Sequence, residues 1–313
     1  MFRKLIDFFS FSDWPLEYQP VRHTFFRDSK LAEILNHTGY YIADFIGEKE
    51  RLLLLDVYKK HQQKDEYEVQ YEERDTGSAG AYMGVISQTV HQSINEILGP
   101  AFDKWFINYK SAVNAFAVKT PGNSGQVPVH QDVSDLDEEK YSTISIWLPL
   151  QTMSEENGTL QIIPRSHHIF VPYRASTLEP LTKNIEPLLT PYFVPLYLKA
   201  GQALFFDSRL FHQSPPNLSK ENRVVALCRI CPQDAPIVTY YKDPLVSDSK
   251  VEMWQCPDDY LIYSENHEEK RPPKNGKFLG YKNANISPIT PEEFERRRRK
   301  LGILPFQNKT ELN

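Results

Sequence analysis

A series of short β-rich runs between about residues 105 and 235 constrains the fold of this 313-residue chain more than any other feature. In these runs β-branched and aromatic residues alternate with other types, and Gly, Pro, Asn or Asp separates one run from the next. The runs are SAVNAFAVK, YSTISIWLPL, GTLQIIP, VPLYLKAGQALFFDS and NRVVALCRIC. Because exposed sheet edges are disfavoured, we expect an antiparallel core that closes as a jelly roll or barrel.

Helical patterns flank the predicted β core, and we interpret residues 1–313 as a single domain. Residues 1–104 read as a helical flank with a charged and then Gly-rich lid loop, and the last helix of this flank is expected to end at Gly99. Residues 236–313 are expected to form wrapping loops and a C-terminal helix. The sequence therefore predicts a mainly β protein with flanking helices around a core at 105–235.

The sequence predicts where the C-terminal helix begins. Thr290, Pro291 and Glu293 have the pattern of an N-cap, a first-turn proline and a capping-box glutamate. The run RRRRK at 296–300 complements the negative end of the helix dipole, and a phosphate or nucleic-acid site is the alternative interpretation.

The charge balance argues against polyanionic partners. The chain has 36 Lys and Arg against 41 Asp and Glu, a net charge of −5, so no global positive field gathers nucleic acid or anionic membrane. Three cysteines are too few for a disulfide framework and fit a reducing compartment. No apolar run approaches the roughly 18 residues of a membrane span. We expect a cytoplasmic protein that acts on a small molecule, without nucleic-acid or membrane partners.

The tripeptide His130-Gln131-Asp132 is the first candidate for chemistry. On an extended chain, residues i and i+2 project from the same side, so an imidazole and a carboxylate can converge on one point. This spacing suits a pair of metal ligands. The alternative is a polar strand end with a local hydrogen bond.

His212 is the second candidate, because it follows an apolar strand that begins after a turn at Gly201. With His130 and Asp132 it could complete a face of two histidines and one carboxylate on one iron. Such a face leaves three adjacent coordination positions open for a co-substrate and O₂. Considered alone, a histidine at such a position is more often a strand histidine with ordinary partners.

Arg223 lies eleven residues after His212, in the apolar run NRVVALCRIC. A buried arginine needs a carboxylate partner, and its planar guanidinium matches a carboxylate with two parallel hydrogen bonds. A dicarboxylate co-substrate would supply that partner. An ion pair with a protein Asp or Glu is the alternative.

Together these residues resemble the phytanoyl-CoA dioxygenase family of Fe(II)/2-oxoglutarate oxygenases. The resemblance is carried by His130-x-Asp132, by the segment from Glu156-Asn157-Gly158 to Pro164-Arg165-Ser166-His167, by Gly201 to Asp207, and by His212-x-Ser214 with Arg223. It spans about residues 105–235. One departure is Arg165, which stands where the family usually carries glycine.

The resemblance implies a double-stranded β-helix of the jelly-roll or cupin type that uses Fe(II), 2-oxoglutarate and O₂. It implies that His130, Asp132 and His212 hold the iron. It also implies that Arg223 binds the distal carboxylate of 2-oxoglutarate, that Ser214 assists it, and that Trp147 lies near the co-substrate.

Three further motifs receive weaker interpretations. His167 and His168 are expected in a surface turn without a metal role. Asn114 could hydrogen-bond the co-substrate, but strand parity alone leaves open which face of the sheet it occupies. Cys228 and Cys231 form a C-x-x-C spacing, yet on a strand they point to opposite faces, so we expect them to be small strand fillers.

The expected reaction is hydroxylation of an unactivated carbon in a polar small molecule. Loops at 64–92 and 133–141 are expected to cover the mouth of the site, and they carry Tyr82, Gln88, His91, Asp135, Asp137, Glu138 and Glu139. An acidic rim favours a polar or cationic substrate over an acyl-CoA. A non-redox cupin-like metal enzyme and a catalytically silent binding module on the same fold are the alternatives.

Overall fold

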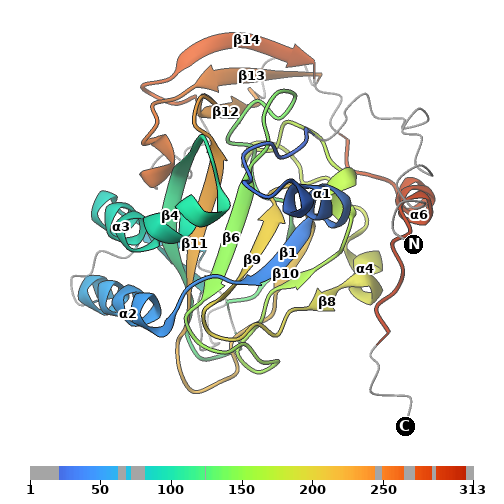
Figure 1. Ribbon diagram of the computed structural model, residues 1–313. Coiled ribbons are helices and arrows are strands. Elements are labelled where there is room, and N and C mark those ends of the chain that lie inside the picture. Colours follow the sequence, from blue (N-terminus) through green and yellow to red (C-terminus); the bar gives the residue numbers. More distant parts are fainter. Residues whose placement is uncertain are drawn as a thin grey trace.

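Two facing sheets form the centre of the molecule in the computed structural model (Figure 1). The structure describes residues 21–62, 68–71, 82–123, 125–243, 249–263, 272–283 and 287–307. The larger sheet has the order β1-β9-β6-β11-β4-β3-β2. Its strands are β1 (Tyr40–Asp44), β9 (Gln202–Asp207), β6 (Ile144–Pro149), β11 (Arg223–Pro232), β4 (Tyr109–Lys119), β3 (Tyr82–Val85) and β2 (Glu68–Tyr71).

The smaller sheet has the order β5-β10-β7-β8. Its strands are β5 (Val127–His130), β10 (His212–Ser214), β7 (Gln161–Ile162) and β8 (Val194–Pro195). All strand pairs of both sheets that the structure describes are antiparallel. The prediction of a mainly β chain with flanking helices and a jelly-roll core is confirmed.

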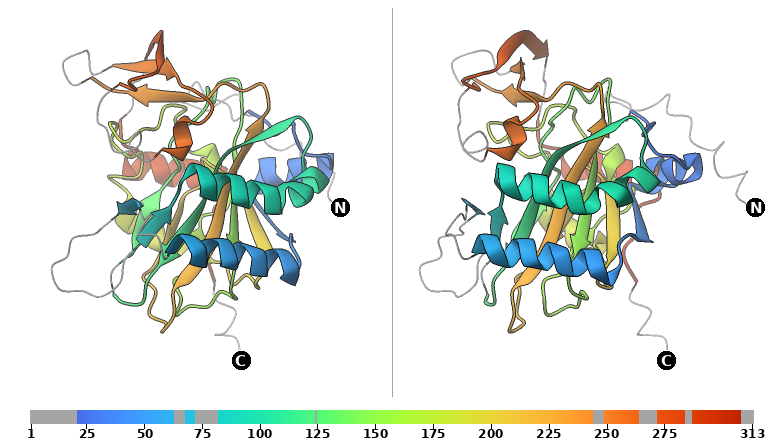
Figure 2. Two further views of the ribbon diagram at one scale, coloured as in Figure 1. Left: turned by 90° about the vertical axis from the view of Figure 1, so that its left-hand side faces the viewer. Right: turned by 60° about the vertical axis from the view of Figure 1, so that its left-hand side comes forward.

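Helices α2 (Glu48–Gln62) and α3 (Gln88–Trp105) lie side by side across the outer face of the larger sheet (Figure 2). The expected helix end at Gly99 is wrong, because α3 continues through Pro100. Phe102, three residues beyond Gly99, is fully buried against the sheet. The apolar stripe of the helix therefore continues past the Gly-Pro pair, and its packing outweighs the backbone hydrogen bond that proline removes.

Neighbouring residues of β4 and β11 point to opposite faces of the larger sheet. Phe116 and Cys228 pack among the helices, whereas Ala117 and Val225 pack in the layer between the sheets, together with Ile162 of β7. This period of two separates an outer face that holds the helices from an inner face that lines the centre of the jelly roll.

The two strand cysteines have the expected structural role. Cys228 and Cys231 are buried in different hydrophobic clusters, and neither forms a disulfide. Burial raises the pKa of the Cys231 thiol to about 12 and that of Cys228 further. Neither thiol is therefore ionised near neutral pH.

A third sheet replaces most of the loops expected after residue 236, so that part of the prediction is wrong. Its strands have the order β12-β13-β14, with β12 (Val238–Tyr241), β13 (Lys250–Gln255) and β14 (Lys277–Asn283). Val251 and Met253 of β13 pack against Tyr173, which lies in the connection after β7. The strands were obscured in the sequence because they are short and β14 is largely exposed. That residues 1–313 form one oxygenase domain stays a prediction.

The C-terminal helix α6 (Pro291–Lys300) begins as predicted, with the Glu293 amide donating to Thr290 Oγ1 at 3.2 Å. Within the helix, Glu293 pairs with Arg296 and Arg297, and Glu295 pairs with Arg298 and Arg299. These local pairs account for the basic run. The remaining helices are α1 (Ser29–Thr38) and the short α4 (Glu186–Leu189), and no helix among the described residues is long and apolar enough to cross a membrane.

Arg165 adopts a left-handed backbone conformation with a φ of 68°. Glycine adopts this conformation without strain, which explains the glycine of the family motif at this position. The arginine side chain has two contacts that a glycine lacks. Its Nη1 donates to the Leu301 carbonyl at 3.0 Å, and its Nη2 lies 3.0 Å from Nε2 of His37. Arg165 therefore ties the end of α6 to the end of α1.

Replacing Arg165 should separate the backbone strain from the side-chain contacts. Arg165→Ala keeps the strain and removes both contacts, so we expect a loss of about 1–2 kcal/mol in the free energy of unfolding. Arg165→Gly removes the same contacts but relieves strain of about 1 kcal/mol, so the loss should be smaller. Urea unfolding of the three proteins gives the order, and a glycine variant less stable than the alanine variant would contradict this account.

Two histidines, His23 and His167, are buried beside α1. His23 is 3% exposed and lies 3.1 Å from the Asp207 carboxylate, which also pairs with the buried Arg209. His167 is 1% exposed, and its Nε2 lies 3.1 Å from the Asn36 carbonyl. Burial lowers the pKa of His23, although Asp207 opposes the shift, and burial lowers the pKa of His167 to about 4. The expectation that His167 lies in a surface turn is wrong.

These histidines should make the fold sensitive to mild acid. His167 binds a proton near pH 6.5 when unfolded, but burial lowers its pKa in the folded protein to about 4, so the free energy of unfolding falls as the pH drops below 6.5. The expected slope for His167 is about 1 kcal/mol per pH unit, and the lowered pKa of His23 acts in the same direction. Urea unfolding between pH 7 and pH 5 measures it. His167→Gln should flatten the slope, and an unchanged slope in that variant would remove His167 from the explanation.

Candidate metal centre

Strands β5 and β10 bring His130 and His212 together, because the two residues face each other in the antiparallel register. Their ring centroids are 4.1 Å apart. Nδ1 of each ring lies 2.9 Å from the carbonyl two residues earlier, Pro128 for His130 and Leu210 for His212. Since a carbonyl only accepts hydrogen bonds, each Nδ1 carries the proton and each Nε2 keeps a free lone pair. Both rings are therefore oriented as metal ligands.

Asp132 completes the arrangement from just beyond the end of β5. Its Oδ1 lies 3.9 Å from Nε2 of His130 and 3.7 Å from Nε2 of His212. The three ligand atoms all lie within 4.8 Å of one another, and this is the one such group found among the described residues. The His130 side chain is 37% exposed and the His212 side chain 6%. The triad is therefore accessible from the side of His130.

The other carboxylate oxygen of Asp132 is occupied by donors. Ser145 Oγ donates to Oδ2 at 2.7 Å, and the Arg229 guanidinium lies 3.1 Å from the same atom. Burial alone would raise the pKa of Asp132, but Arg229 and the two histidines lower it to about 2. Burial and the neighbouring His212 lower the pKa of His130 to about 4. At neutral pH the site therefore presents a carboxylate and at least one neutral imidazole, the forms that bind a divalent metal.

Two buried basic side chains, Arg223 and Lys119, form a basic group near the triad. Arg223 is 1% exposed, and its Nη1 donates to the Gly158 carbonyl at 3.0 Å. Its guanidinium carbon lies 5.7 Å from the centre of the Trp147 ring. In the sheet register Arg223 faces Lys119, whose Nζ donates to the Ser214 carbonyl at 2.8 Å. Burial and the nearby Arg223 lower the pKa of Lys119 to about 6.

Residues around this basic group lie on the same strands as residues around the triad. Ser214 lies two residues after His212 on β10, and Trp147 lies two residues after Ser145 on β6, so each pair shares a face of its strand. The structure thus brings Arg223, Trp147 and Ser214 into one region that adjoins the triad. Lys119 belongs to this region and was missed, although it is a charged residue at the end of an apolar run.

Arg229 and Ser145 were also missed. Arg229 stands inside the C-x-x-C spacing that we set aside for its cysteines, and it is six residues after Arg223 on the same strand. An even separation puts two strand residues on one face unless a bulge intervenes. The register shift between β11 and β4 falls after Arg229, so the even spacing from Arg223 could have predicted a second arginine on the inner face.

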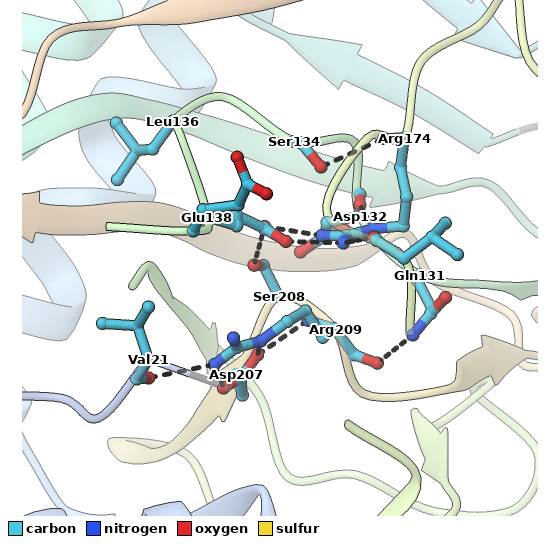
Figure 3. A network of polar contacts seen from close by, with 12 residues as sticks. Val21, Gln131, Asp132, Ser134, Leu136, Glu138, Arg174, Asp207, Ser208 and Arg209 are labelled. Atoms are coloured by element: carbon cyan, nitrogen blue, oxygen red, sulfur yellow. Dashed lines mark hydrogen bonds and ion pairs between the residues drawn. The ribbon is translucent and has the colours of Figure 1, made fainter. Parts of the chain in front are cut away.

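The expected acidic rim is wrong, because all four of its acids are held in ion pairs and three of them are buried. Asp135, Asp137 and Glu138 are each 5% exposed or less. Figure 3 shows Glu138 held by two 2.7 Å hydrogen bonds from Arg174, whose Nε donates to the Asp132 carbonyl. The remaining acids pair with cations: Asp135 with Arg229, Asp137 with Lys140, and Glu139 with Lys282. The cations that pair with Glu138 and Asp135 also contact Asp132, so this segment packs beside the candidate metal ligand and does not form an acidic rim.

Asn114, a candidate contact of the co-substrate, and the other expected lid residues also have structural places. Asn114 lies on the outer face of β4, where its backbone N–H donates to Nδ1 of His91 on α3 at 3.1 Å and its side-chain Nδ2 donates to the His91 carbonyl at 3.3 Å, so it does not face the triad. Gln88 begins α3 and Tyr82 begins β3. Two further parts of the expected lid, residues 64–67 and 72–81, lie outside the described residues.

The facing sheets and the triad define a class of protein, a double-stranded β-helix with a candidate site of two histidines and one carboxylate. Two solved structures share the fold at low sequence identity. The carbocyclase SnoK from nogalamycin biosynthesis, described as non-haem and α-ketoglutarate-dependent, is 18% identical with a TM-score of 0.53, over 70% of this chain and 90% of its own. The epimerase SnoN is 15% identical with a TM-score of 0.52, over 67% and 85%.

The family model of phytanoyl-CoA dioxygenase matches residues 23–225, and the chain belongs to this family. Phytanoyl-CoA dioxygenase 1 of Oryza sativa subsp. japonica is 31% identical over 163 residues, which are 45% of this chain and 58% of the relative. Phytanoyl-CoA dioxygenase domain-containing protein 1 of Danio rerio is 30% identical over 118 residues, 35% and 40% respectively. The chain thus spans about half the length of these curated relatives. The family resemblance seen in the sequence is confirmed.

Proposed function

We propose that the chain is a non-haem Fe(II)/2-oxoglutarate-dependent dioxygenase with His130, Asp132 and His212 as the iron ligands. The observation that carries the proposal is the convergence of two Nε2 atoms and one carboxylate oxygen within 4.8 Å, with the Nδ1 atom of each ring against a backbone carbonyl. Three protein ligands on one face leave adjacent positions open for a chelating co-substrate and O₂. Bound iron and 2-oxoglutarate would supply the oxidising power for the reaction.

We propose Arg223 as the partner of the distal carboxylate of 2-oxoglutarate, with Ser214 and Trp147 beside it. Two buried basic side chains, Arg223 and Lys119, face each other here, and burial and the nearby Arg223 lower the pKa of Lys119. An anion between or beside them would raise that pKa again and stabilise the charged lysine. The guanidinium suits a carboxylate because its donors are parallel. Trp147 supports the guanidinium plane from one side.

The proposed reaction is hydroxylation of an unactivated carbon in a polar small molecule. The carboxylate of Asp132 is present, so the protein leaves no ligand vacancy for a halide, which favours oxygen transfer over halogenation. The acids that would have favoured a cationic substrate form ion pairs within the protein, so they give no such preference. A cytoplasmic location is part of the proposal and is supported by three buried free cysteines.

One spectroscopic experiment separates this proposal from its two alternatives. Fe(II) and 2-oxoglutarate added to the protein without O₂ should give a visible charge-transfer band, because the keto acid chelates the iron. A non-redox cupin-like enzyme and a silent binding module both predict a colourless mixture. Absence of the band at saturating Fe(II) and 2-oxoglutarate would overturn the proposal.

Removing a ligand should abolish catalysis without unfolding the protein. His130→Ala, Asp132→Ala and His212→Ala should each eliminate detectable 2-oxoglutarate turnover and weaken Fe(II) binding. The circular dichroism spectrum should stay close to that of the wild type, because the ligands lie at the edge of a core that packs without them. His37→Ala, which changes an exposed histidine on α1, is the control. Full activity in any ligand variant would remove that residue from the site.

Arg223→Lys should weaken 2-oxoglutarate binding more than iron binding. The lysine keeps the charge but loses the two parallel donors, so the apparent KM for 2-oxoglutarate should rise about 10- to 100-fold. The Fe(II) dissociation constant should change less than threefold. Arg51→Lys, at an exposed pair with Glu48 on α2, is the matched control. An unchanged KM would mean that Arg223 serves only contacts within the protein.

A further inference from the structure

Arg229 lies where the family match has already ended. The match covers residues 23–225, so Arg229 on β11 and the sheet β12-β13-β14 belong to the part of the chain beyond it. The Arg229 side chain is 15% exposed and contacts two carboxylates. Its Nη2 lies 3.1 Å from Oδ2 of Asp132, and its Nη1 pairs with Asp135. One guanidinium therefore spans the candidate ligand and the segment that follows it.

The contacts of Asp132 divide its two oxygens between different tasks. Oδ2 receives Arg229 and the Ser145 hydroxyl, whereas Oδ1 faces Nε2 of both histidines at 3.9 Å and 3.7 Å. A carboxylate with one oxygen held by two donors presents the other oxygen to the metal. Rotation that would exchange the two oxygens breaks both contacts.

We propose that Arg229 is a positioning residue that holds Asp132 as a one-oxygen metal ligand and ties this ligand to the sheet β12-β13-β14. The inference rests on the proposed metal site. Partners that orient a metal ligand are worth about 10- to 100-fold in metal affinity. Arginine suits the role because its planar fork reaches two carboxylates at once, which the single ammonium of lysine cannot do.

The second carboxylate of this bridge is anchored by β12. The Val238 amide donates to the Asp135 carbonyl at 2.9 Å, and the Tyr240 hydroxyl donates to the Leu136 carbonyl at 3.5 Å. Asp135 is thereby held to a strand that lies outside the jelly roll. Because Arg229 contacts both Asp135 and Asp132, it links the Asp132 carboxylate to this strand.

A purely structural role for Arg229 makes a different prediction. If the arginine only neutralised Asp135 and held the segment in place, removing either partner would affect the metal site to the same extent. If it orients Asp132, loss of Arg229 alone should change the metal. Comparing Arg229→Gln with Asp135→Asn separates these roles, because Asp135→Asn leaves the contact between Arg229 and Asp132 in place.

The test is titration of the metal-free 313-residue chain with Co(II), followed by its visible absorption, with urea unfolding measured on the same samples. We expect Arg229→Gln to raise the Co(II) dissociation constant about 10- to 100-fold and to shift the Co(II) band. Asp135→Asn should change the constant less than threefold even where it lowers stability. Arg229→Lys should recover part of the affinity. Arg298→Gln, an ion-paired arginine of 16% side-chain exposure on α6, is the matched control.

Equal losses of affinity in Arg229→Gln and Asp135→Asn, or an unchanged constant in Arg229→Gln, would overturn the inference. If Arg229→Gln does not fold, Ser145→Ala and Arg229→Lys decide. Each removes part of the hold on Oδ2, so each should weaken Co(II) binding, and wild-type affinity in both would overturn it. A wild-type protein that binds neither Co(II) nor Fe(II) would instead remove the proposed function itself.

Discussion

The candidate site depends on the register between two very short strands. β5 and β10 pair so that His130 stands opposite His212, and the register shifts immediately beyond that pair. A slip of one residue would turn one imidazole to the other face of the sheet and dissolve the triad. Strands of four and three residues have little pairing energy of their own, so the packed layer between the two sheets has to specify the register. The chemistry is therefore a property of the whole jelly roll and not of the motif alone.

Sequence patterns predict features that depend on neighbouring residues along the chain. They do not predict features that depend on contacts between distant segments. The β-rich runs and the i, i+2 spacing of His130 and Asp132 are local, and they predicted the β core and the convergence of these two side chains. The face occupied by Asn114 depends on which side of the sheet the helices cover, which no local pattern states. Lys119 acquires its setting from Arg223, more than a hundred residues away in the chain.

The misreading of the acids has the same origin. Asp137, Glu138 and Glu139 look like a solvated loop because their partners, among them Arg174 and Lys282, lie on distant segments. Asp137 and Glu138 become part of the packing once these pairs are formed. Breaking the pair between Glu138 and Arg174, in which both side chains are buried, leaves a buried charge uncompensated at a cost of about 3–5 kcal/mol. Strand β14 was similarly hidden, because a largely exposed strand lacks the apolar alternation that marks a half-buried one.

Strand β11 passes from the region shared with the family into the region beyond it without interruption, carrying one arginine in each part. This continuity limits how the protein can be recombined with its relatives. A chimera joined within the loop after β11 would keep both arginines but lose β12, the anchor of Asp135. A chimera joined near residue 225 would keep Arg223 and exchange Arg229 together with the added sheet. Arg229, Asp135 and β12 therefore form a single unit of exchange, and transplanting one of them alone gives a metal ligand without its support.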